Sequence, residues 1–236
     1  MPTTRPAQAT RSTRRTPAPR SRRSSPPPSP SRPARRIPLV PILFGVIGLF
    51  GVVAVVASRG AGHDGVPAGV QQVRPVSVSG TALPVLGDGA DPAEGVVIPE
   101  VDGKDFAGDP VALRRDGVPK LIVFLAHWCP HCRNEVPVIT GWLADKGAPE
   151  GVELLSVSTA ASLDRPNYPP STWLDQEGWT LPALVDDADG TVARAYGLSA
   201  FPFFVAVDAQ GEVVARGSGE LDVEALEHLI DRARSG

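Results

Sequence analysis

Two cysteines separated by two residues are the part of this sequence that most directly indicates chemistry. Cys129 and Cys132 are the only cysteines among the 236 residues, and they enclose Pro130 and His131. On one helical turn they lie on the same side and can close a small disulfide ring with little backbone movement. Such a short loop removes little entropy from the unfolded chain. The spacing therefore favours a reversible redox pair over a structural crosslink.

Other interpretations of the pair are weaker. Two inert thiols or a structural disulfide could stand anywhere in the fold. This pair instead directly follows an apolar segment, at the start of a predicted helix. A structural zinc site needs four ligands, and the chain has no second cysteine pair. We therefore predict no metal site.

The flanking segments predict a strand that leads into a helix. Residues 120–126 form a continuous apolar run after Lys120, which is typical of a strand buried on both faces of a parallel sheet. Residues 130–146 have apolar residues at helical spacing, and Gly147 is a stop signal. The dithiol is thus expected where a helix begins.

The rest of the C-terminal region alternates between the two kinds of element. Strands are expected near residues 152–157, 181–185, 203–207 and 212–216, and helices near 171–177, 190–196 and 221–234. This order predicts an α/β fold with a mixed central sheet flanked by helices on both faces.

The first 58 residues have a different character. Residues 1–36 contain ten arginines and no acidic residue, interleaved with serine and proline, which predicts a disordered tail. Residues 37–57 carry no charge, so we predict one transmembrane helix over 37–58, a signal anchor with a cytoplasmic N-terminus. A cleaved secretory signal is the alternative.

The remaining chain is acidic. Of the 23 Lys and Arg residues ten lie in the tail, whereas all 26 Asp and Glu residues follow residue 57. This balance argues against a nucleic-acid partner outside the cell. Residues 59–94 are rich in Gly, Val, Pro and Ala and are expected to form a flexible extracytoplasmic linker. Residues 95–236 are expected to form one domain.

Motif, order and spacing together resemble the thioredoxin fold, and within it the membrane-tethered TlpA/ResA-like thioredoxins of bacteria. The residues that carry this resemblance are Trp128, Cys129, Cys132, Arg133, Glu135, Pro137, Phe201 and Pro202. Two positions depart from the pattern. Val123 stands where thioredoxins carry a buried Asp, and His131 is familiar from DsbA-type oxidases. The direction of electron flow is therefore open.

The motif assigns roles to four residues. Cys129 is the expected nucleophile, because the positive end of a helix stabilises a thiolate, and Cys132 would resolve the mixed disulfide. His131 could donate to the thiolate or place positive charge beside it, with a solvated loop histidine as the alternative. Pro130 suits the first helical position and is mostly structural.

Four further residues complete the predicted site. Glu135 could move protons to the buried sulfur in place of an acid at Val123, with an exposed helix carboxylate as the alternative. The resemblance implies a cis peptide at Pro202, which would expose the backbone of Phe201 to a partner. Trp128 is expected to form a docking platform, with core packing as the alternative.

These observations predict a membrane-anchored, extracytoplasmic thiol-disulfide oxidoreductase with no cofactor beyond its own dithiol. Its partners would be cysteines of exported proteins and a redox protein that recycles the dithiol. One alternative is a peroxiredoxin-like peroxidase, although Ala126 stands where that chemistry needs Thr or Ser. Another is a metal-binding or haem-maturation module without catalytic activity.

Overall fold

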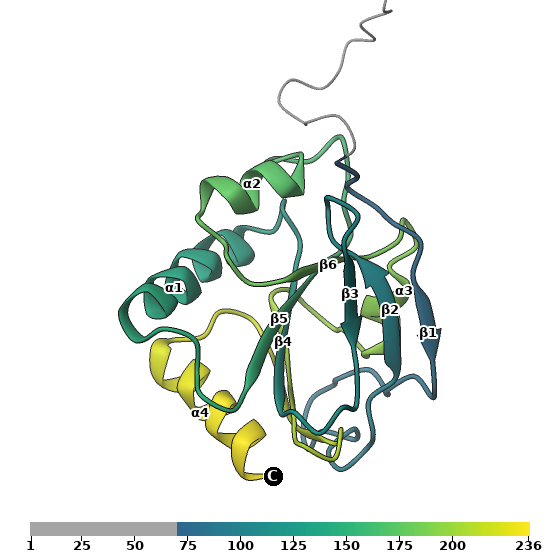
Figure 1. The fold of residues 1–236 in the computed structure, drawn as a ribbon, viewed down its shortest axis with the longest axis vertical. Helices are drawn as coiled ribbons and strands as arrows, with labels where there is room; N and C mark the ends of the chain where they lie inside the picture. Colours follow the sequence, from purple (N-terminus) through teal and green to yellow (C-terminus); the bar gives the residue numbers. More distant parts are fainter. Residues whose placement is uncertain (1–69) are drawn as a thin grey trace, which may run out of the picture. The chain divides into compact units, whose positions relative to one another are not determined.

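A computed structural model describes residues 70–236 (Figure 1). The predicted tail, the predicted membrane helix and residues 59–69 of the predicted linker lie outside the described residues. Among the helices of residues 70–236, none is long and apolar enough to cross a bilayer.

Twelve elements follow one another in the described chain. The strands are β1 Ser77–Ser79, β2 Glu100–Lys104, β3 Pro110–Leu113, β4 Lys120–Leu125, β5 Glu153–Ser158, β6 Ala183–Val185, β7 Phe203–Val207 and β8 Val213–Ser218. The helices are α1 Pro130–Lys146, α2 Pro170–Gln176, α3 Thr191–Ala195 and α4 Val223–Ser235.

A mixed sheet forms the centre of the fold, with the strand order β6-β5-β4-β7-β8. Strand β4 pairs in parallel with β5 and antiparallel with β7, and β8 closes the antiparallel hairpin. All six residues of β4 are buried, as its continuous apolar run predicted. The strand that leads to the dithiol is therefore completely enclosed, as is its neighbour β7.

The two faces of this sheet are covered differently (Figure 1). Because side chains alternate along a strand, Leu121, Val123 and Leu125 pack with α1, α2 and α4. Ile122 and Phe124 face the opposite core, which α3 and a separate three-stranded sheet, β1-β2-β3, share. This confirms the mixed sheet flanked by helices, whereas the three-stranded sheet was not predicted.

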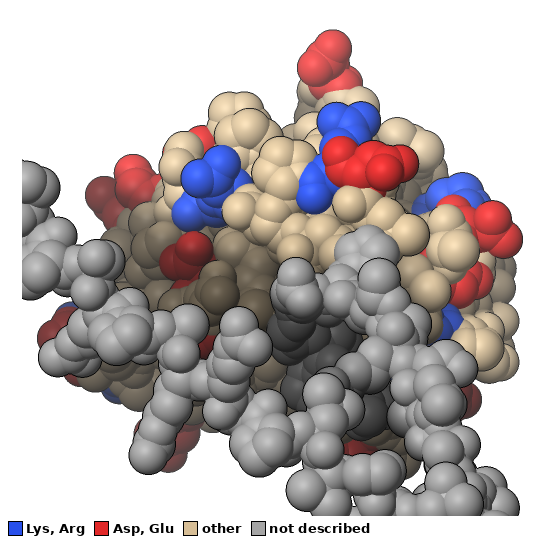
Figure 2. Space-filling view, turned by 90° about the horizontal axis from the view of Figure 1, so that it is seen from above, with Lys and Arg blue, Asp and Glu red and all other residues tan. Residues whose placement is uncertain are grey.

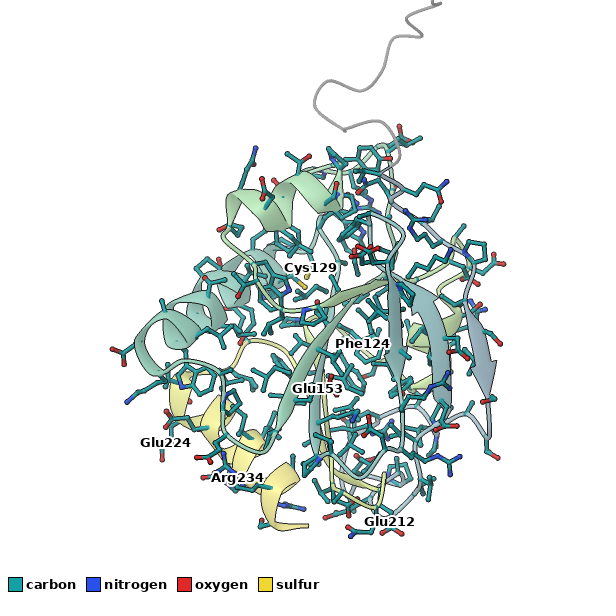
Figure 3. The ribbon with its side chains drawn as sticks, viewed as in Figure 1. Phe124, Cys129, Glu153, Glu212, Glu224 and Arg234 are labelled. Atoms are coloured by element: carbon teal, nitrogen blue, oxygen red, sulfur yellow. The ribbon has the colours of Figure 1, made fainter. Side chains whose placement is uncertain are left out.

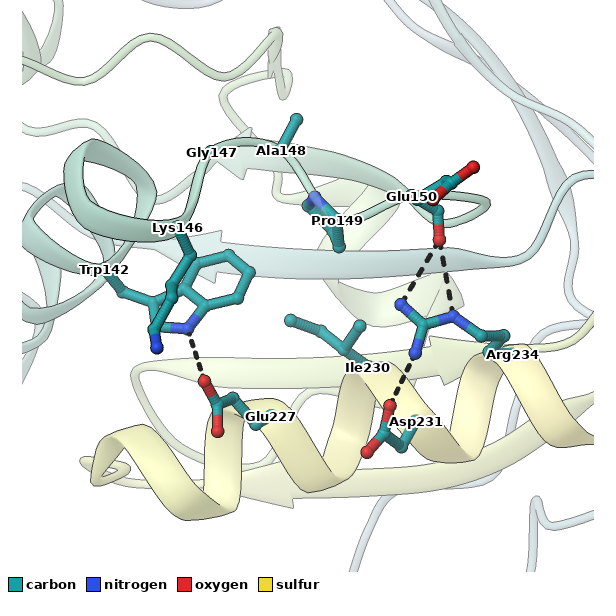
Figure 4. Close-up of a pocket in the computed structure, with 10 residues that line it drawn as sticks. All are labelled: Trp142, Lys146, Gly147, Ala148, Pro149, Glu150, Glu227, Ile230, Asp231 and Arg234. Carbon is teal, nitrogen blue, oxygen red and sulfur yellow. Dashed lines mark hydrogen bonds and ion pairs between the residues drawn. The ribbon is translucent and has the colours of Figure 1, made fainter.

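Helices α1 and α4 pack against each other at the end of α1 that lies farthest from the dithiol (Figure 4). Trp142 Nε1 donates a hydrogen bond of 3.0 Å to Glu227, and the Arg234 guanidinium donates to the carbonyl of Glu150 and to Asp231. The Trp142 bond ties the C-terminal part of α1 to α4, and the Arg234–Glu150 bond ties α4 to the loop that follows α1.

Residues 70–94, which we predicted to be part of a flexible linker, belong to the folded domain. The predicted domain boundary after residue 94 is therefore wrong. Strand β1 pairs with β2, and Leu83 and Ala93 are buried in the second core. Asp91 forms an ion pair of 2.5 Å with the buried Arg216 of β8. The apolar residues of this segment are scattered and show no periodicity, so the sequence did not predict this packing. The segment contacts the domain through individual residues such as Leu83, Ala93 and Asp91.

Candidate active site

The dithiol lies where strand β4 passes into helix α1. Cys129 is the N-cap of α1, its backbone N–H bonds to the carbonyl of Ala126, and Pro130 follows at the first helical position. Both cysteines are free thiols, with Cys129 6% exposed and Cys132 fully buried. In Figure 3, Cys129 lies at the end of the sheet opposite Glu212. The predicted placement of the pair at a helix start is confirmed.

The two sulfur atoms have different surroundings. Cys132 Sγ accepts a hydrogen bond of 3.5 Å from the backbone N–H of Ala126. Burial raises the pKa of Cys132 strongly, and the negative charges of Cys129 and Glu135 raise it further. Cys132 is therefore protonated at neutral pH. Cys129 Sγ is the outer sulfur and donates to the carbonyl of Phe201 at 3.8 Å.

The Phe201-Pro202 peptide is cis, as the resemblance implied. Pro202 is buried next to β7, and its carbonyl accepts a hydrogen bond of 2.9 Å from the backbone N–H of Gly219. The loop before β7 thus faces the nucleophile directly. A second cis peptide, Tyr168-Pro169, was not predicted.

Trp128 lies half-buried beside this loop. Its ring packs edge-to-face on Phe201, with centroids 5.8 Å apart, and its Nε1 donates to the carbonyl of Ala160 at 2.9 Å. The guanidinium of Arg165 stands 5.0 Å above the ring. Trp128 is therefore fixed in orientation and presents part of its surface next to Cys129.

His131 bonds to a carboxylate and not to a sulfur. Its Nδ1 lies 2.6 Å from Glu220 Oε1, which also accepts a hydrogen bond of 3.0 Å from Asn134. The His131 ring is exposed. The hydrogen bonds to His131 and Asn134 hold the pKa of Glu220 below its usual range. His131 is thus bonded to Glu220, a residue that the sequence did not identify.

Glu135 is fully buried, which excludes the exposed helix carboxylate that we considered. Its Oε2 accepts a hydrogen bond of 2.7 Å from the backbone N–H of Leu221. Burial raises the pKa of Glu135 to about 7. Val123, where a related acid would stand, is packed in the apolar core. Glu135 is therefore a titratable group close to neutrality beside the inner sulfur.

His127, two residues before the nucleophile, organises the adjoining loop. Its Nδ1 lies 2.7 Å from the carbonyl of Pro166, and its Nε2 accepts a hydrogen bond of 3.1 Å from the backbone N–H of Ser162. This pairing requires the neutral ring with the proton on Nδ1. Burial lowers the pKa of His127 accordingly. Within residues 70–236, no three His, Cys, Asp or Glu side chains are grouped closely enough to hold a metal ion.

The mixed sheet and a dithiol facing a cis-proline define a thioredoxin-like fold. The family model described as Redoxin matches residues 93–230, and the chain belongs to this family. The solved structure of a protein assigned as a DsbE-type thiol:disulfide interchange protein from Chlorobium tepidum has a TM-score of 0.50 and 24% identity. The superposition covers 59% of this chain and 96% of the Chlorobium tepidum chain, and this likeness supports the fold alone.

Curated relatives carry names of thiol-disulfide exchange proteins. A DsbE homolog of Paracoccus denitrificans is 35% identical over 109 residues, which span 46% of this chain and 55% of that protein. HelX of Rhodobacter capsulatus is 28% identical over 122 residues, which span 52% of this chain and 64% of HelX. ResA of Halalkalibacterium halodurans is 23% identical over 129 residues, which span 54% of this chain and 70% of ResA. The match thus spans between about half and two thirds of the first two relatives.

Proposed function

We propose that this chain is a thiol-disulfide oxidoreductase that exchanges disulfides with cysteines of other proteins. The observation that carries the proposal is the asymmetric dithiol: an outer sulfur at a helix start facing the cis-Pro202 loop, and a buried sulfur with a raised pKa. The Redoxin family model and the names of the relatives support the same chemistry.

The exchange proceeds in two balanced steps. The Cys129 thiolate attacks one sulfur of a partner disulfide, the partner S–S bond breaks, and the leaving thiolate takes up a proton. The Cys132 thiol then loses its proton and attacks Cys129, which releases the second partner thiol. Two electrons and two protons have then passed to the partner, and Cys129-Cys132 is a disulfide. The reverse sequence oxidises a partner dithiol.

Glu135, three residues after Cys132 in α1 and with its charge acting on that thiol, would take the proton that Cys132 must lose. A carboxyl with a pKa near 7 exchanges a proton readily at neutral pH, whereas a carboxyl at its ordinary pKa would be a weak base. His131 and Pro130 shape the outer sulfur's surroundings. Trp128, Phe201 and Pro202 would receive an extended segment of the partner.

Anchoring in a membrane with the domain outside the cytoplasm is a further part of the proposal. Its support is the uncharged run at residues 37–57 after an arginine-rich segment. The expected result is that the full chain sediments with membranes and that protease added outside the cytoplasm removes the domain. A soluble full chain would contradict anchoring but not the exchange chemistry.

The decisive experiment uses serine variants of the two cysteines. Cys132→Ser should accumulate a mixed disulfide between Cys129 and a partner, because the resolving thiol is missing. Cys129→Ser should form none and should lose exchange. Equal exchange by wild type and Cys129→Ser would refute the function. The reduction potential then gives the direction of electron flow: about −270 mV indicates a reductant and about −120 mV an oxidant. No observation favours the peroxidase or metal-binding alternatives.

A further inference from the structure

Two arginines beside the nucleophile differ from the other arginines of the described chain. Elsewhere in residues 70–236 each guanidinium bonds to a carboxylate, a hydroxyl or a carbonyl oxygen. This group comprises Arg74, Arg114, Arg115, Arg194, Arg216, Arg232 and Arg234. Arg133 and Arg165 are both exposed, and neither guanidinium has an oxygen partner within residues 70–236.

Both of these arginines are close to Cys129. Arg133 follows Cys132 in the first turn of α1, and its backbone N–H bonds to the carbonyl of Cys129. Arg165 stands over Trp128, the residue before the nucleophile. The Arg165 guanidinium therefore lies on the rim over which a partner must approach, and Arg133 is an exposed residue of the helix turn that begins at Cys129.

The position of Arg165 is held by the fold. Residues on either side of it, Ser162 and Pro166, are bonded to the two ring nitrogens of His127. Asn167 Nδ2 donates to the backbone carbonyl of His127 at 2.9 Å. A guanidinium held over an aromatic ring loses little further freedom on binding, which favours recognition of a carboxylate.

Acidic groups of the rim do not neutralise Arg165. Glu220 Oε1 contacts His131 and Asn134, and neither Glu220 nor the exposed Asp164 forms an ion pair with Arg165. On the face drawn in Figure 2, basic and acidic side chains lie in small mixed groups and not in one broad field. Beside Trp128 the charged group on the described chain is the Arg165 guanidinium, so a charge preference there would be local.

We infer that Arg165, assisted by Arg133, is a specificity-determining residue that binds an acidic side chain of the partner polypeptide a few residues from its reactive cysteine. The partner's carboxylate would supply the oxygen ligands that these guanidinium groups lack in the described chain. The inference rests on the proposed exchange function and narrows its substrate class.

The test compares three synthetic peptides that differ only in the residues flanking one cysteine: Glu, Gln or Lys. The full chain in its oxidised form reacts with each peptide thiol, and the rate of reduction of Cys129-Cys132 is recorded. The wild type should react about fivefold or more faster with the Glu peptide than with the Lys peptide. This preference should shrink between 50 and 500 mM salt, because salt screens exposed charges.

Charge reversal provides the matched comparison. Arg165→Glu should invert the order of the Glu and Lys peptides, and Arg133→Glu should weaken the preference. The control is Lys146→Glu, an equal charge change at the other end of α1, roughly 20 Å from Arg133 along the helix axis. It should leave the order and the ratio unchanged.

The outcomes separate the inference from the function. An unchanged preference in Arg165→Glu, or an equal change in Lys146→Glu, would overturn the inference while leaving exchange intact. Equal rates of the wild type with all three peptides would overturn it as well. If the wild type reacts with none of them and with no protein disulfide, the proposed function fails, and the substrate inference fails with it.

Discussion

The backbone N–H of Leu221 donates a hydrogen bond of 2.7 Å to Glu135, where helix α1 meets the loop that precedes α4. The other carboxyl oxygen, Oε1, is buried and accepts no hydrogen bond within residues 70–236. One donor compensates a buried negative charge incompletely, so the pKa of Glu135 rises to about 7. The carboxyl thus changes charge in the pH range in which thiol exchange proceeds.

Glu135→Gln should flatten the pH dependence of disulfide exchange between about pH 6 and 8. The amide keeps an oxygen for the Leu221 N–H but can neither take up the Cys132 proton nor change charge. We expect the rate at pH 8 to fall about tenfold or more, as for loss of a general base. The rate profile of the wild type and variant measures this, and two superimposable profiles would exclude a proton-transfer role.

Stability should respond to the same substitution with a defined sign. In the unfolded chain a Glu ionises near its ordinary pKa, whereas folded Glu135 ionises near 7. Its favourable contribution is complete below the unfolded pKa and is lost as the pH rises through about 7, by at most about 3.5 kcal/mol. Urea unfolding of wild type and Glu135→Gln at pH 4.5 and 8 should show the variant gaining relative stability at pH 8.

The fold around the dithiol could be predicted because local signals agree there. The strand at β4, the helix from Pro130 to Lys146 and the β7-β8 hairpin each follow from apolar runs, proline or glycine positions, and turn residues. The sheet β1-β2-β3 was missed because its short strands are only partly buried and carry no clear alternation. Strands of that kind are specified by what they pack against, which a single sequence does not display.

Long-range partners of the site were beyond sequence reasoning for a related reason. Cys129, Cys132 and Pro202 belong to motifs with fixed spacing, whereas Glu220 lies 89 residues from His131. An isolated Glu in a loop has no pattern that assigns it to a redox site. Only the closure of the β7-β8 hairpin beside α1 brings its carboxylate to the imidazole.

Glu220→Gln should make the disulfide more oxidising through His131. Loss of the carboxylate bonded to His131 removes a negative charge from the helix turn that begins at Cys129, which favours the Cys129 thiolate. The equilibrium constant with glutathione should shift about two- to fivefold toward the reduced protein. In a His131→Ala background the same substitution should have little effect. An equal shift in both backgrounds would show that His131 does not transmit it.

The reduced protein should incorporate one equivalent of a thiol-alkylating reagent while folded. Cys129 is the outer sulfur, whereas Cys132 is fully buried and its pKa is raised by burial. We expect Cys132 to react about 100-fold more slowly, or only after unfolding in urea. Peptide mapping after a short exposure identifies the labelled cysteine. Simultaneous labelling of both would contradict the asymmetry on which the proposed function depends.

The segment before residue 95 should be required for full stability. Asp91 forms an ion pair with Arg216, whose side chain is completely buried, and this pair lowers the pKa of Asp91. Asp91→Ala leaves that guanidinium without its carboxylate and should cost about 2 to 4 kcal/mol. The control is Asp102→Ala, which removes the exposed partner of Arg114 and should cost less than about 1 kcal/mol. Equal losses of unfolding free energy in the two variants would show that the Asp91–Arg216 ion pair contributes no more than an exposed ion pair.

The loop that carries Arg165 should loosen as the pH falls, because His127 must stay neutral to hold it. A protonated ring would confront the Ser162 N–H with a second donor. The pKa of His127 is lowered in the folded state, so its contribution to stability is present above the ordinary histidine pKa, about 6.5, and declines as the pH drops through the folded value.

Hydrogen exchange of the Ser162 amide provides the measurement for this loop. Its protection, corrected for intrinsic exchange, should decrease from pH 7 to pH 5 in the wild type. In His127→Phe it should be about tenfold lower at pH 7 and independent of pH, since the ring acceptor is absent. His228→Phe, at an exposed position of α4, is the control and should match the wild type. Retained protection of Ser162 in His127→Phe would show that other contacts fix the loop, and the positioning of Arg165 would then need a different explanation.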